Sequence, residues 1–400
     1  EVDRTAGANP IRQAVPNLAD AGQMYGSIIY HKAPIMMRQL ELMLGEAKFR
    51  EGMQEYLGRY AGGNVTWPEL IAILDRKTST DLKAWSAVWV NSPGRPQFEV
   101  ASSGSGSVQI RQRDPAGQSR VWPQQFSVMA GLGEEATSVA LQSTSAVTPW
   151  PGGAPASDSP LLFNANALGY GLFPAGLETM EAWNTLTDLQ QGTLLVDLNE
   201  NLLAQNGVLP AAYLQALLGA LAVEESALVL TLVLDQASYI YQVLLTDAER
   251  RAAQPQVESV LWQRLESESD PGLARQFFEA WTALATAPAA LERMHRIWSG
   301  EESPAQFTLS ERDLIRLTQI LAIRLPRQAD KIVAAQLVRI KNPDNRRRLT
   351  FIAPALAADA AVRDAFFASL ADAQNRGTER WVVDALASLH HPSRTDHSVK

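Results

Sequence analysis

The chain contains no cysteine, which excludes disulfides, thiolate zinc sites and cysteine nucleophiles but leaves the redox compartment open. Basic residues are in deficit, with 35 Lys and Arg against 43 Asp and Glu. The net charge of -8 argues against nucleic acid or an anionic membrane as the main partner. The longest apolar region, residues 208–234, is interrupted by Pro210, Gln215 and Glu224-Glu225. Because a membrane-spanning helix needs about 20 apolar residues in a row, we expect buried helices here and no membrane span.

Motifs of self-contained catalysis are also missing. The chain has no P-loop, no G-x-S-x-G and no G-x-G-x-x-G that opens a helix. The histidines form no H-E-x-x-H and no pair spaced four residues apart. They are His31, His295, His390, His391 and His397. His390-His391 precedes Pro392 at a predicted helix end, where a histidine most often only favours the helix dipole. We therefore expect no metal site and no bound cofactor within this chain.

The composition that is present describes a globular chain. A length of 400 residues predicts two or three domains, and 46% hydrophobic with 20% charged residues is typical of a soluble protein. The chain starts at Glu1 without a Met or a signal-like apolar stretch, which suggests that it was cut from something longer. A removed signal peptide would also fit, so the compartment stays open between cytoplasm, periplasm and the extracellular space.

The first helix contains an awkward proline. Residues 1–20 are predicted to be irregular, and a helical pattern runs from about Asp20 to Leu44. Pro34 lies inside this pattern and cannot donate a hydrogen bond to the carbonyl of Tyr30, four residues earlier. The helix should therefore kink at or just after Tyr30, or start anew near Pro34.

Three more helices are predicted before the first domain boundary. One covers about 46–60, and Thr66-Trp67-Pro68-Glu69 has the form of a capping box that opens the next. Thr80 is expected to cap the last of them. Asn91-Ser92-Pro93-Gly94-Arg95-Pro96 then predicts a helix stop and the boundary itself.

From residue 97 the hydrophobic period changes from about 3.6 to 2, which predicts strands. The expected strands cover residues 97–102, 107–113, 124–132, 135–142 and 160–167. Several short strands joined by Gly-rich and Pro-rich turns favour a small antiparallel β-sandwich.

From about Leu177 the strand pattern stops and roughly ten amphipathic helices follow. Short connections between such helices favour an α-solenoid of the HEAT/armadillo type. A weak repeat supports it, because the D-x-x-L-x-x-x-F-F pattern at Asp270 recurs with Val for Leu at Asp359, 89 residues later. The predicted fold is thus mainly α with a small β-sandwich, in domains of residues 1–95, 96–176 and 177–400.

Two polar residues of the first helix, Tyr30 and Lys32, each allow two interpretations. A tyrosine in an apolar helix usually belongs to the core and has its hydroxyl satisfied. Alternatively, the phenol stays protonated at neutral pH and donates a hydrogen bond to an oxyanion. The kink expected at Tyr30 favours the second interpretation modestly. A snorkelling role for Lys32 is at least as common as a role in catalysis.

Several motifs carry a resemblance to a known family. Tyr30-His31-Lys32-Ala33-Pro34 resembles the segment that follows the zinc site in gluzincin aminopeptidases of the aminopeptidase N family. The resemblance continues through Phe49-Arg50-Glu51-Gly52 and Asn64-Val65-Thr66-Trp67-Pro68-Glu69-Leu70, and Trp122–Val128 resembles the family's small β-sandwich. The last part resembles the closing helical domain of bacterial members, at Asn342-Pro343-Asp344, Glu379-Arg380-Trp381-Val382 and Leu389-His390-His391-Pro392.

Two positions depart from the family pattern. Lys32-Ala33 replaces a common lysine-glycine, and Gly169-Tyr170-Gly171-Leu172-Phe173 replaces an exit phrase with two tyrosines and an arginine. The second departure puts in doubt any contact made by that exit segment.

The resemblance implies that the chain is the C-terminal part of a zinc aminopeptidase. It would comprise the end of a thermolysin-like catalytic domain, the β-sandwich and a helical domain that closes the substrate chamber. In the intact parent, residues upstream of Glu1 would bind zinc, and Tyr30 would stabilise the oxyanion, with Lys32 as a candidate support. The partners would be peptides with a free N-terminus. Because H-E-x-x-H is not in this chain, we expect the chain alone to be inactive and to hold no zinc.

Two alternatives stay open. The chain would fit a non-enzymatic helical-repeat scaffold that binds a protein partner, or a degenerate homologue that has the fold but no metal ligands. An H-E-x-x-H motif encoded upstream of Glu1 would decide for the enzyme, and an unrelated upstream domain would decide for the scaffold.

Overall fold

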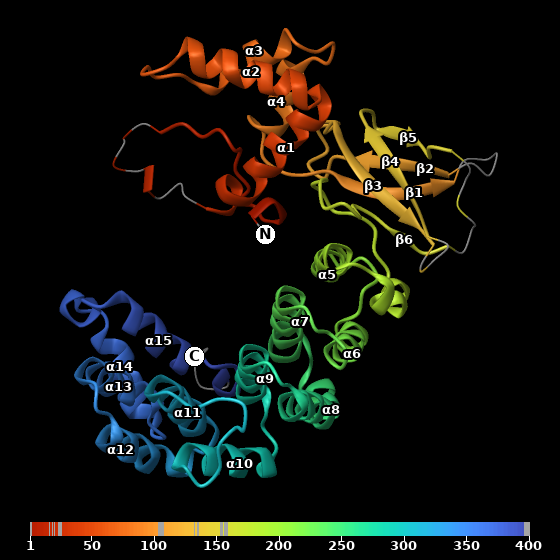
Figure 1. The fold of residues 1–400 in the computed structure, drawn as a ribbon. Helices are drawn as coiled ribbons and strands as arrows, with labels where there is room; N and C mark the ends of the chain where they lie inside the picture. Colours follow the sequence, from red (N-terminus) through yellow and green to blue (C-terminus); the bar gives the residue numbers. More distant parts are fainter. Residues whose placement is uncertain are drawn as a thin grey trace. The chain divides into compact units, whose positions relative to one another are not determined.

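The computed structural model describes residues 2–15, 17, 19, 21–22, 26–102, 108–131, 133, 136–152, 155 and 159–395. The chain divides into two compact units between Leu209 and Pro210, and each is described by itself (Figure 1). The first contains helices α1–α5 and two small antiparallel sheets, and the second is helical. The expectation of a mainly α protein with a small amount of β-structure is confirmed, whereas the finer division into three domains stays a prediction.

The predicted irregularity near Pro34 is a change of helix type. After the short 3-10 helix η1 (Val2–Arg4), a π-helical turn η3 (Ile28–Lys32) runs directly into α1 (Ala33–Leu44). The N–H of Ala33 donates to the carbonyl of Ile28, five residues back, and Lys32 keeps helical angles of φ -74° and ψ -46°. The helix therefore widens where Pro34 removes a donor and does not break there. The predicted start of the helix at Asp20 lies outside the described residues.

Three further helices complete this part of the first unit: α2 (Glu46–Arg59), α3 (Trp67–Asp75) and α4 (Leu82–Trp89). The predicted capping box at α3 is confirmed, because the Glu69 carboxylate accepts from the N–H of Thr66 at 2.7 Å. The cap of α4 is Asp81 and not Thr80, since the Asp81 side chain accepts from the N–H of Ala84. The apolar faces of α1, α3 and α4 form one core around Trp85 and Trp89.

The predicted strands form two three-stranded sheets. The first has the order β1-β2-β5, from β1 (Gln97–Ser102), β2 (Val108–Arg113) and β5 (Val147–Pro149). The second has the order β4-β3-β6, from β4 (Thr137–Ser143), β3 (Gln124–Ala130) and β6 (Leu161–Leu162). All pairings between these strands are antiparallel, in register Phe98↔Gln112 and Val128↔Val139.

Two strands differ from the prediction. Strand β5 was not predicted, and the strand expected at 160–167 is regular only over Leu161–Leu162. Asn164 and Ala167 have positive φ, which ends the extended conformation there. The predicted tip at Ser103–Gly106 lies outside the described residues. The two sheets enclose Phe98, Phe126 and Phe173, whose rings lie 4.9–5.2 Å apart.

Side chains of the first helices reach the backbone of the second sheet. Gln39 on α1 is fully buried, and its amide exchanges hydrogen bonds with the N–H and carbonyl of Gln125 at 2.8 and 2.7 Å. The indole N–H groups of Trp85 and Trp89 both donate to the carbonyl of Pro123, at 3.1 and 2.9 Å. Because these contacts are buried and directional, they fix α1 and α4 against β3. The unit ends with η5 (Leu177–Thr185) and α5 (Asp188–Leu203).

The second unit contains helices that pack mainly against their neighbours in sequence. Its elements are α6 (Pro210–Leu221), α7 (Ala227–Tyr239), η6 (Ile240–Leu244), α8 (Asp247–Ser267), α9 (Pro271–Leu284), α10 (Pro288–Ser299), α11 (Glu311–Arg324), η7 (Pro326–Gln328), α12 (Ala329–Arg339), α13 (Pro343–Leu356), α14 (Ala360–Ser369), η8 (Ala373–Arg376), α15 (Glu379–Leu389) and η9 (Pro392–Arg394).

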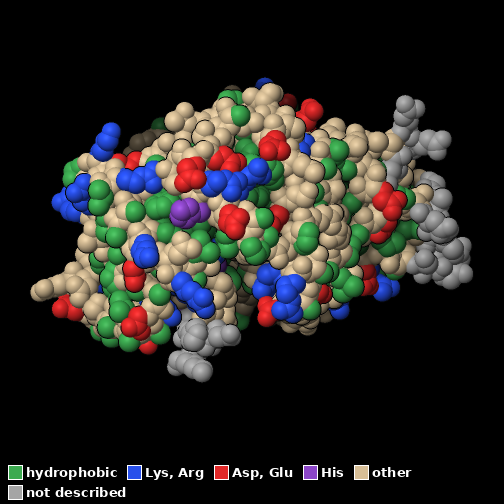
Figure 2. Space-filling view, turned by 90° about the horizontal axis from the view of Figure 1, so that it is seen from below, with side chains coloured by type: hydrophobic (Ala, Val, Ile, Leu, Met, Phe, Trp, Pro, Cys, Tyr) green, Lys and Arg blue, Asp and Glu red, His purple; other side chains and the backbone are tan. Residues whose placement is uncertain are grey.

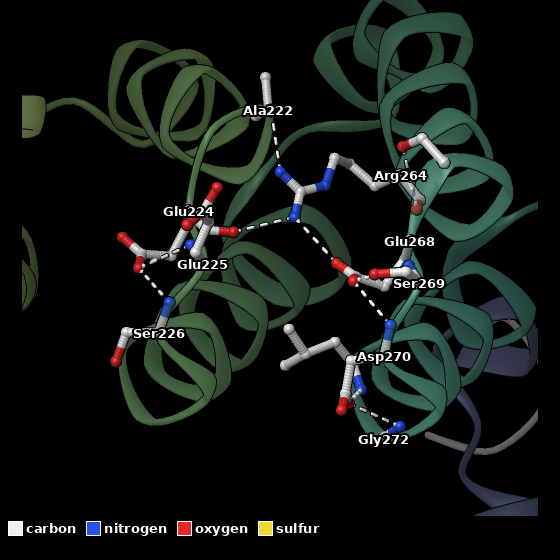
Figure 3. A network of polar contacts seen from close by, with 11 residues as sticks. Ala222, Glu224, Glu225, Ser226, Arg264, Glu268, Ser269, Asp270 and Gly272 are labelled. Atoms are coloured by element: carbon white, nitrogen blue, oxygen red, sulfur yellow. Dashed lines mark hydrogen bonds and ion pairs between the residues drawn. The ribbon is translucent and has the colours of Figure 1, made fainter.

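Arginines connect helix ends in this unit. Arg264 at the end of α8 donates to the carbonyls of Ala222 and Glu224, 3.0 and 2.9 Å away (Figure 3). Arg324 donates to the carbonyls of Thr282 and Ala285, and Arg394 to that of Ala355. Each arginine satisfies carbonyls that a helix end leaves without an intrahelical partner, 38 to 42 residues earlier in the chain.

The sequence repeat at Asp270 and Asp359 corresponds to two helix N-caps. Both carboxylates accept from backbone N–H groups at the starts of α9 and α14. The phenylalanines that follow differ, because Phe277 and Phe278 are buried whereas Phe367 is 53% exposed. The similarity is therefore local and does not extend to packing.

The surface and the apolar helices agree with a globular chain. On the face drawn in Figure 2, the acidic and basic side chains of the described residues alternate and form no field of one sign. One described helical stretch, Ala227–Leu244, has the length and composition to cross a membrane, with a mean hydropathy of 1.4 and 39% of it buried. Core helices also pass this test, so it does not establish a span.

Candidate functional site

Tyr30 lies on the π-helical turn and projects away from the core. Its side chain is 61% exposed, whereas Ile28 and Lys32 on the same turn are buried. The interpretation of Tyr30 as a core residue is therefore wrong. A single-turn π-helix departs from regular hydrogen bonding, and such turns occur frequently at functional sites. The phenol therefore lies at the surface of this unit and not in its core.

Lys32 lies on the opposite side of the same turn and is only 1% exposed. Its Nζ donates to Asp3 Oδ2 at 2.7 Å and to the carbonyl of Gly94 at 2.7 Å, and it faces the Tyr170 ring at 5.3 Å. Burial lowers the pKa of Lys32 below its ordinary value, and the adjacent Asp3 carboxylate opposes that shift. Lys32 therefore neither snorkels to the surface nor faces the same space as Tyr30.

Asp3 accepts hydrogen bonds from Lys32 and from two residues near it. Its side chain is 1% exposed, and its second carboxylate oxygen accepts from the N–H of Gly94 at 3.2 Å. The Tyr170 hydroxyl donates to Asp3 Oδ2 at 3.0 Å. Burial, with the Asp3 charge as the next cause, raises the pKa of Tyr170, so this phenol stays a donor at all physiological pH values. We call Asp3, Lys32, Gly94 and Tyr170 the Lys32 network.

Strand β3 holds Tyr170 in place. Gln124 on β3 accepts from the N–H of Tyr170 at 2.8 Å and donates to its carbonyl at 3.1 Å. Gly171 allows this segment to pass close to β1, because a Cβ there would lie 3.0 Å from Phe98 and 3.1 Å from the carbonyl of Pro96. The segment Gly169–Phe173, which departs from the family's exit phrase, therefore still makes a defined contact through Tyr170.

A second polar cluster adjoins the Lys32 network. Glu200 on α5 pairs with Arg4 at 2.6 Å and with Arg95 at 2.5 Å. Asp197, one turn earlier, is fully buried, and burial together with the Glu200 charge raises its pKa well above the ordinary range. Both clusters join the N-terminal segment to the segment after α4, and they join both of these to Tyr170 or to α5.

Among the described residues, no group of three His, Asp or Glu side chains is arranged to hold a metal ion. His391 accepts from the N–H of Ser393 at 3.2 Å and begins η9. Burial and the nearby Arg324 and Arg394 charges lower the pKa of His391 to about 4. The His391 ring nitrogen thus caps the start of η9, and the expectation that the His390-His391 pair favours a helix dipole stays a prediction.

Comparisons with known proteins show what the first part of the chain is similar to. Residues 1–89 match the model described as Peptidase family M1 domain. Aminopeptidase N of Streptomyces lividans is 33% identical over 119 residues, which cover 28% of this chain and 14% of that protein. Tricorn protease-interacting factor F2 of Thermoplasma acidophilum is 26% identical over 34% of this chain and 18% of that protein. The resemblance seen in the sequence is thus confirmed.

A solved structure extends the likeness of fold. Legionella pneumophila aminopeptidase A, in complex with aspartic acid, matches over 85% of this chain and 44% of that chain, with a TM-score of 0.54 and 13% identity. At that identity the match concerns the fold alone. The chain aligns with less than half of this structure and with a small part of each curated relative.

Sequence reasoning found Tyr30 and Lys32 but missed their surroundings. Asp3 lies in a stretch predicted to be irregular, and Tyr170 lies in the phrase that departs from the family pattern. They meet although 167 residues separate them. A charged residue predicted inside an apolar helix was the available signal, because a buried lysine requires an acidic partner.

Proposed function

We propose that this chain contributes the transition-state-stabilising tyrosine of an aminopeptidase that removes N-terminal residues from peptides. In this proposal the Tyr30 hydroxyl donates a hydrogen bond to the oxyanion that forms when water adds to the first peptide carbonyl. The observation that carries the proposal is the exposed phenol of Tyr30 on a π-helical turn within the residues that match the peptidase family.

The chemistry of the phenol supports the proposal. A neutral hydroxyl donates to a developing negative charge without taking a proton from the attacking water, so it acts as a stabiliser and not as a base. Its contact strengthens as the carbonyl oxygen gains charge, so it favours the transition state over the bound substrate.

The metal that the family implies does not fit the described residues, which offer no ligand group. We therefore propose that zinc, which assists the reaction in the family, is held in the intact parent by residues outside this chain. The chain alone should give no turnover of an aminoacyl-anilide, even with added zinc. Activity of the purified chain above the blank would contradict this.

For residues 210–395, we propose that the helices form an α-solenoid of the HEAT/armadillo type that closes the substrate chamber. The arginine contacts 38 to 42 residues apart support a repeated unit of about two helices. Asp235 and Glu279 line one groove of about 250 Å³. Asp235 is exposed, whereas Glu279 is half-buried and pairs with Arg316 at 3.1 Å. Crosslinking of a bound peptide to Asp235 would test this idea.

The test of the proposed function is Tyr30→Phe in the intact enzyme. The loss of one oxyanion donor should lower kcat by about 100- to 1000-fold and leave KM nearly unchanged. Tyr60→Phe, at the end of α2, is the matched control and should leave both constants within about twofold. An unchanged kcat in Tyr30→Phe would reject the assignment of Tyr30 as the oxyanion donor.

A further inference from the structure

We propose that Lys32 is a positioning residue for Tyr30. Its buried ion pair with Asp3 fixes the rotation of the π-helical turn about its own axis and so holds the Tyr30 phenol in one direction. The inference rests on the function proposed for Tyr30 and gives Lys32 no contact with substrate.

The geometry of the turn supports this coupling. Residues two apart on a helix lie on roughly opposite sides of it, and here Lys32 is 1% exposed whereas Tyr30 is 61% exposed. A rotation of the turn that moved the phenol would therefore turn Lys32 through the same angle. Since Nζ lies 2.7 Å from both Asp3 Oδ2 and the Gly94 carbonyl, such a rotation would break two buried hydrogen bonds.

The anchors of Lys32 come from three separate segments. Asp3 lies near the N-terminus, Gly94 lies after α4, and Tyr170 lies after strand β6. Gln124 on β3 fixes both backbone groups of Tyr170. Contacts with the sheets of the same unit therefore help to fix the direction of the Tyr30 side chain, in addition to its own helix.

The π-helical register makes such an anchor necessary. The hydrogen bond from Ala33 to Ile28 closes a wider ring than an α-helix does, and Pro34 has no N–H to donate to a carbonyl of the preceding turn. Backbone hydrogen bonding alone holds this turn less firmly than it holds α1. The Lys32 network supplies the missing constraint from the side.

The experiment is a double-mutant cycle in the intact enzyme, with kcat and KM measured for all four forms. Lys32→Met keeps the length of the side chain and removes its charge. It should lower kcat by about 10- to 100-fold with little change in KM, because a displacement of about 1 Å at a catalytic group has effects of this size. In the Tyr30→Phe background, Lys32→Met should lower kcat no further, since the hydroxyl it positions is already gone.

The outcomes separate this inference from the proposed function. An equal loss from Lys32→Met in both backgrounds, or an unchanged kcat, would overturn the positioning role while Tyr30→Phe still supports the oxyanion role. A kcat that Tyr30→Phe leaves unchanged would overturn both. Lys83→Met is the matched control, because that lysine is 73% exposed and lies 3.7 Å from Asp75.

A milder variant covers the case in which Lys32→Met does not fold. Tyr170→Phe removes only the hydroxyl that donates to Asp3. With 3-fluorotyrosine at position 30, the intact enzyme should give one sharp ¹⁹F resonance, and Tyr170→Phe should shift or broaden it and lower kcat by about 3- to 10-fold. An unchanged resonance together with an unchanged kcat would overturn the inference.

Discussion

Within each of the two units, polar contacts join separate segments. The two units differ in how far apart in sequence these segments lie. In residues 2–209, buried contacts join segments that are 62, 86 and 167 residues apart, at Gly94, Gln125 and Tyr170. In residues 210–395, arginines reach carbonyls 38 to 42 residues away, one helix pair after another. The first arrangement depends on a few distant contacts, whereas the second repeats a local one.

This difference has a consequence for function. A residue that must point in one direction is better fixed by contacts from several distant segments than by its own helix. Tyr30 lies in the unit that has such contacts. The helices of the second unit pack mainly against their neighbours in sequence, which is compatible with the chamber-closing role proposed for them.

The largest effect should come from breaking the Lys32 network. Lys32→Met leaves the Asp3 carboxylate buried without its cation, which should lower the free energy of unfolding of the first unit by about 3–5 kcal/mol. Hydrogen exchange should accelerate at residues 28–44 and 91–96 together and stay unchanged in residues 210–395. A loss of protection confined to residues 28–34 would contradict the account of a network that spans the unit.

A smaller and more local effect should follow from Arg324→Met. The variant leaves the carbonyls at the end of α9 without their donor, which should cost about 1–3 kcal/mol. Exchange should accelerate only in α9, α11 and the segments that connect to them. If protection fell across the whole second unit, the contrast between distant and local contacts would be wrong.

A pH dependence of similar or smaller size should appear in the second unit. Folding holds His391 neutral with a pKa of about 4, whereas the unfolded imidazole takes a proton near its ordinary value of 6.5. The free energy of unfolding should therefore be constant above about pH 6.5 and fall by roughly 1–2 kcal/mol as the pH drops to 4, after allowance for partial exposure.

His391→Asn is the control for this pH dependence. It keeps an acceptor for the N–H of Ser393 and removes the titrating group. The difference between the two unfolding curves should vanish above pH 6.5 and grow below it. Parallel curves at all pH values would contradict the assignment.

The smallest effects should come from the two repeated caps. Asp270→Ala and Asp359→Ala each remove a carboxylate that accepts from a helix N-terminus, and each should cost about 1 kcal/mol. The two losses should be equal although Phe277 is buried and Phe367 is 53% exposed. A clearly larger loss at Asp270, seen in urea unfolding, would show that packing and capping are coupled there.

Local features of the fold could be predicted from the sequence. The capping box at Thr66 and Glu69, the change of period at residue 97 and the disturbance around Pro34 all depend on residues a few positions apart. The form of that disturbance could not be predicted, because a kink and a π-helical turn can both accommodate the hydrogen-bond donor that Pro34 lacks. Strand β5 was missed, since three residues are too few to show a period.

The candidate site was half predictable for the same reason. Tyr30 and Lys32 stand out as polar residues in an apolar stretch, so single-sequence reasoning finds them. Their partners Asp3 and Tyr170 lie 29 and about 140 residues from Lys32, and no periodicity relates such positions. Whether Lys32 was exposed or buried therefore had to come from the structure.

The most direct test of the central claim compares the binding of a transition-state analogue with that of a substrate analogue. A peptide phosphonate carries a charged tetrahedral centre like that of the intermediate, whereas a non-hydrolysed peptide carries only the planar amide. Tyr30→Phe in the intact enzyme should weaken phosphonate binding by about 100- to 1000-fold and leave peptide binding within about threefold. Equal weakening of both ligands, or of neither, would contradict the role of Tyr30 as an oxyanion donor.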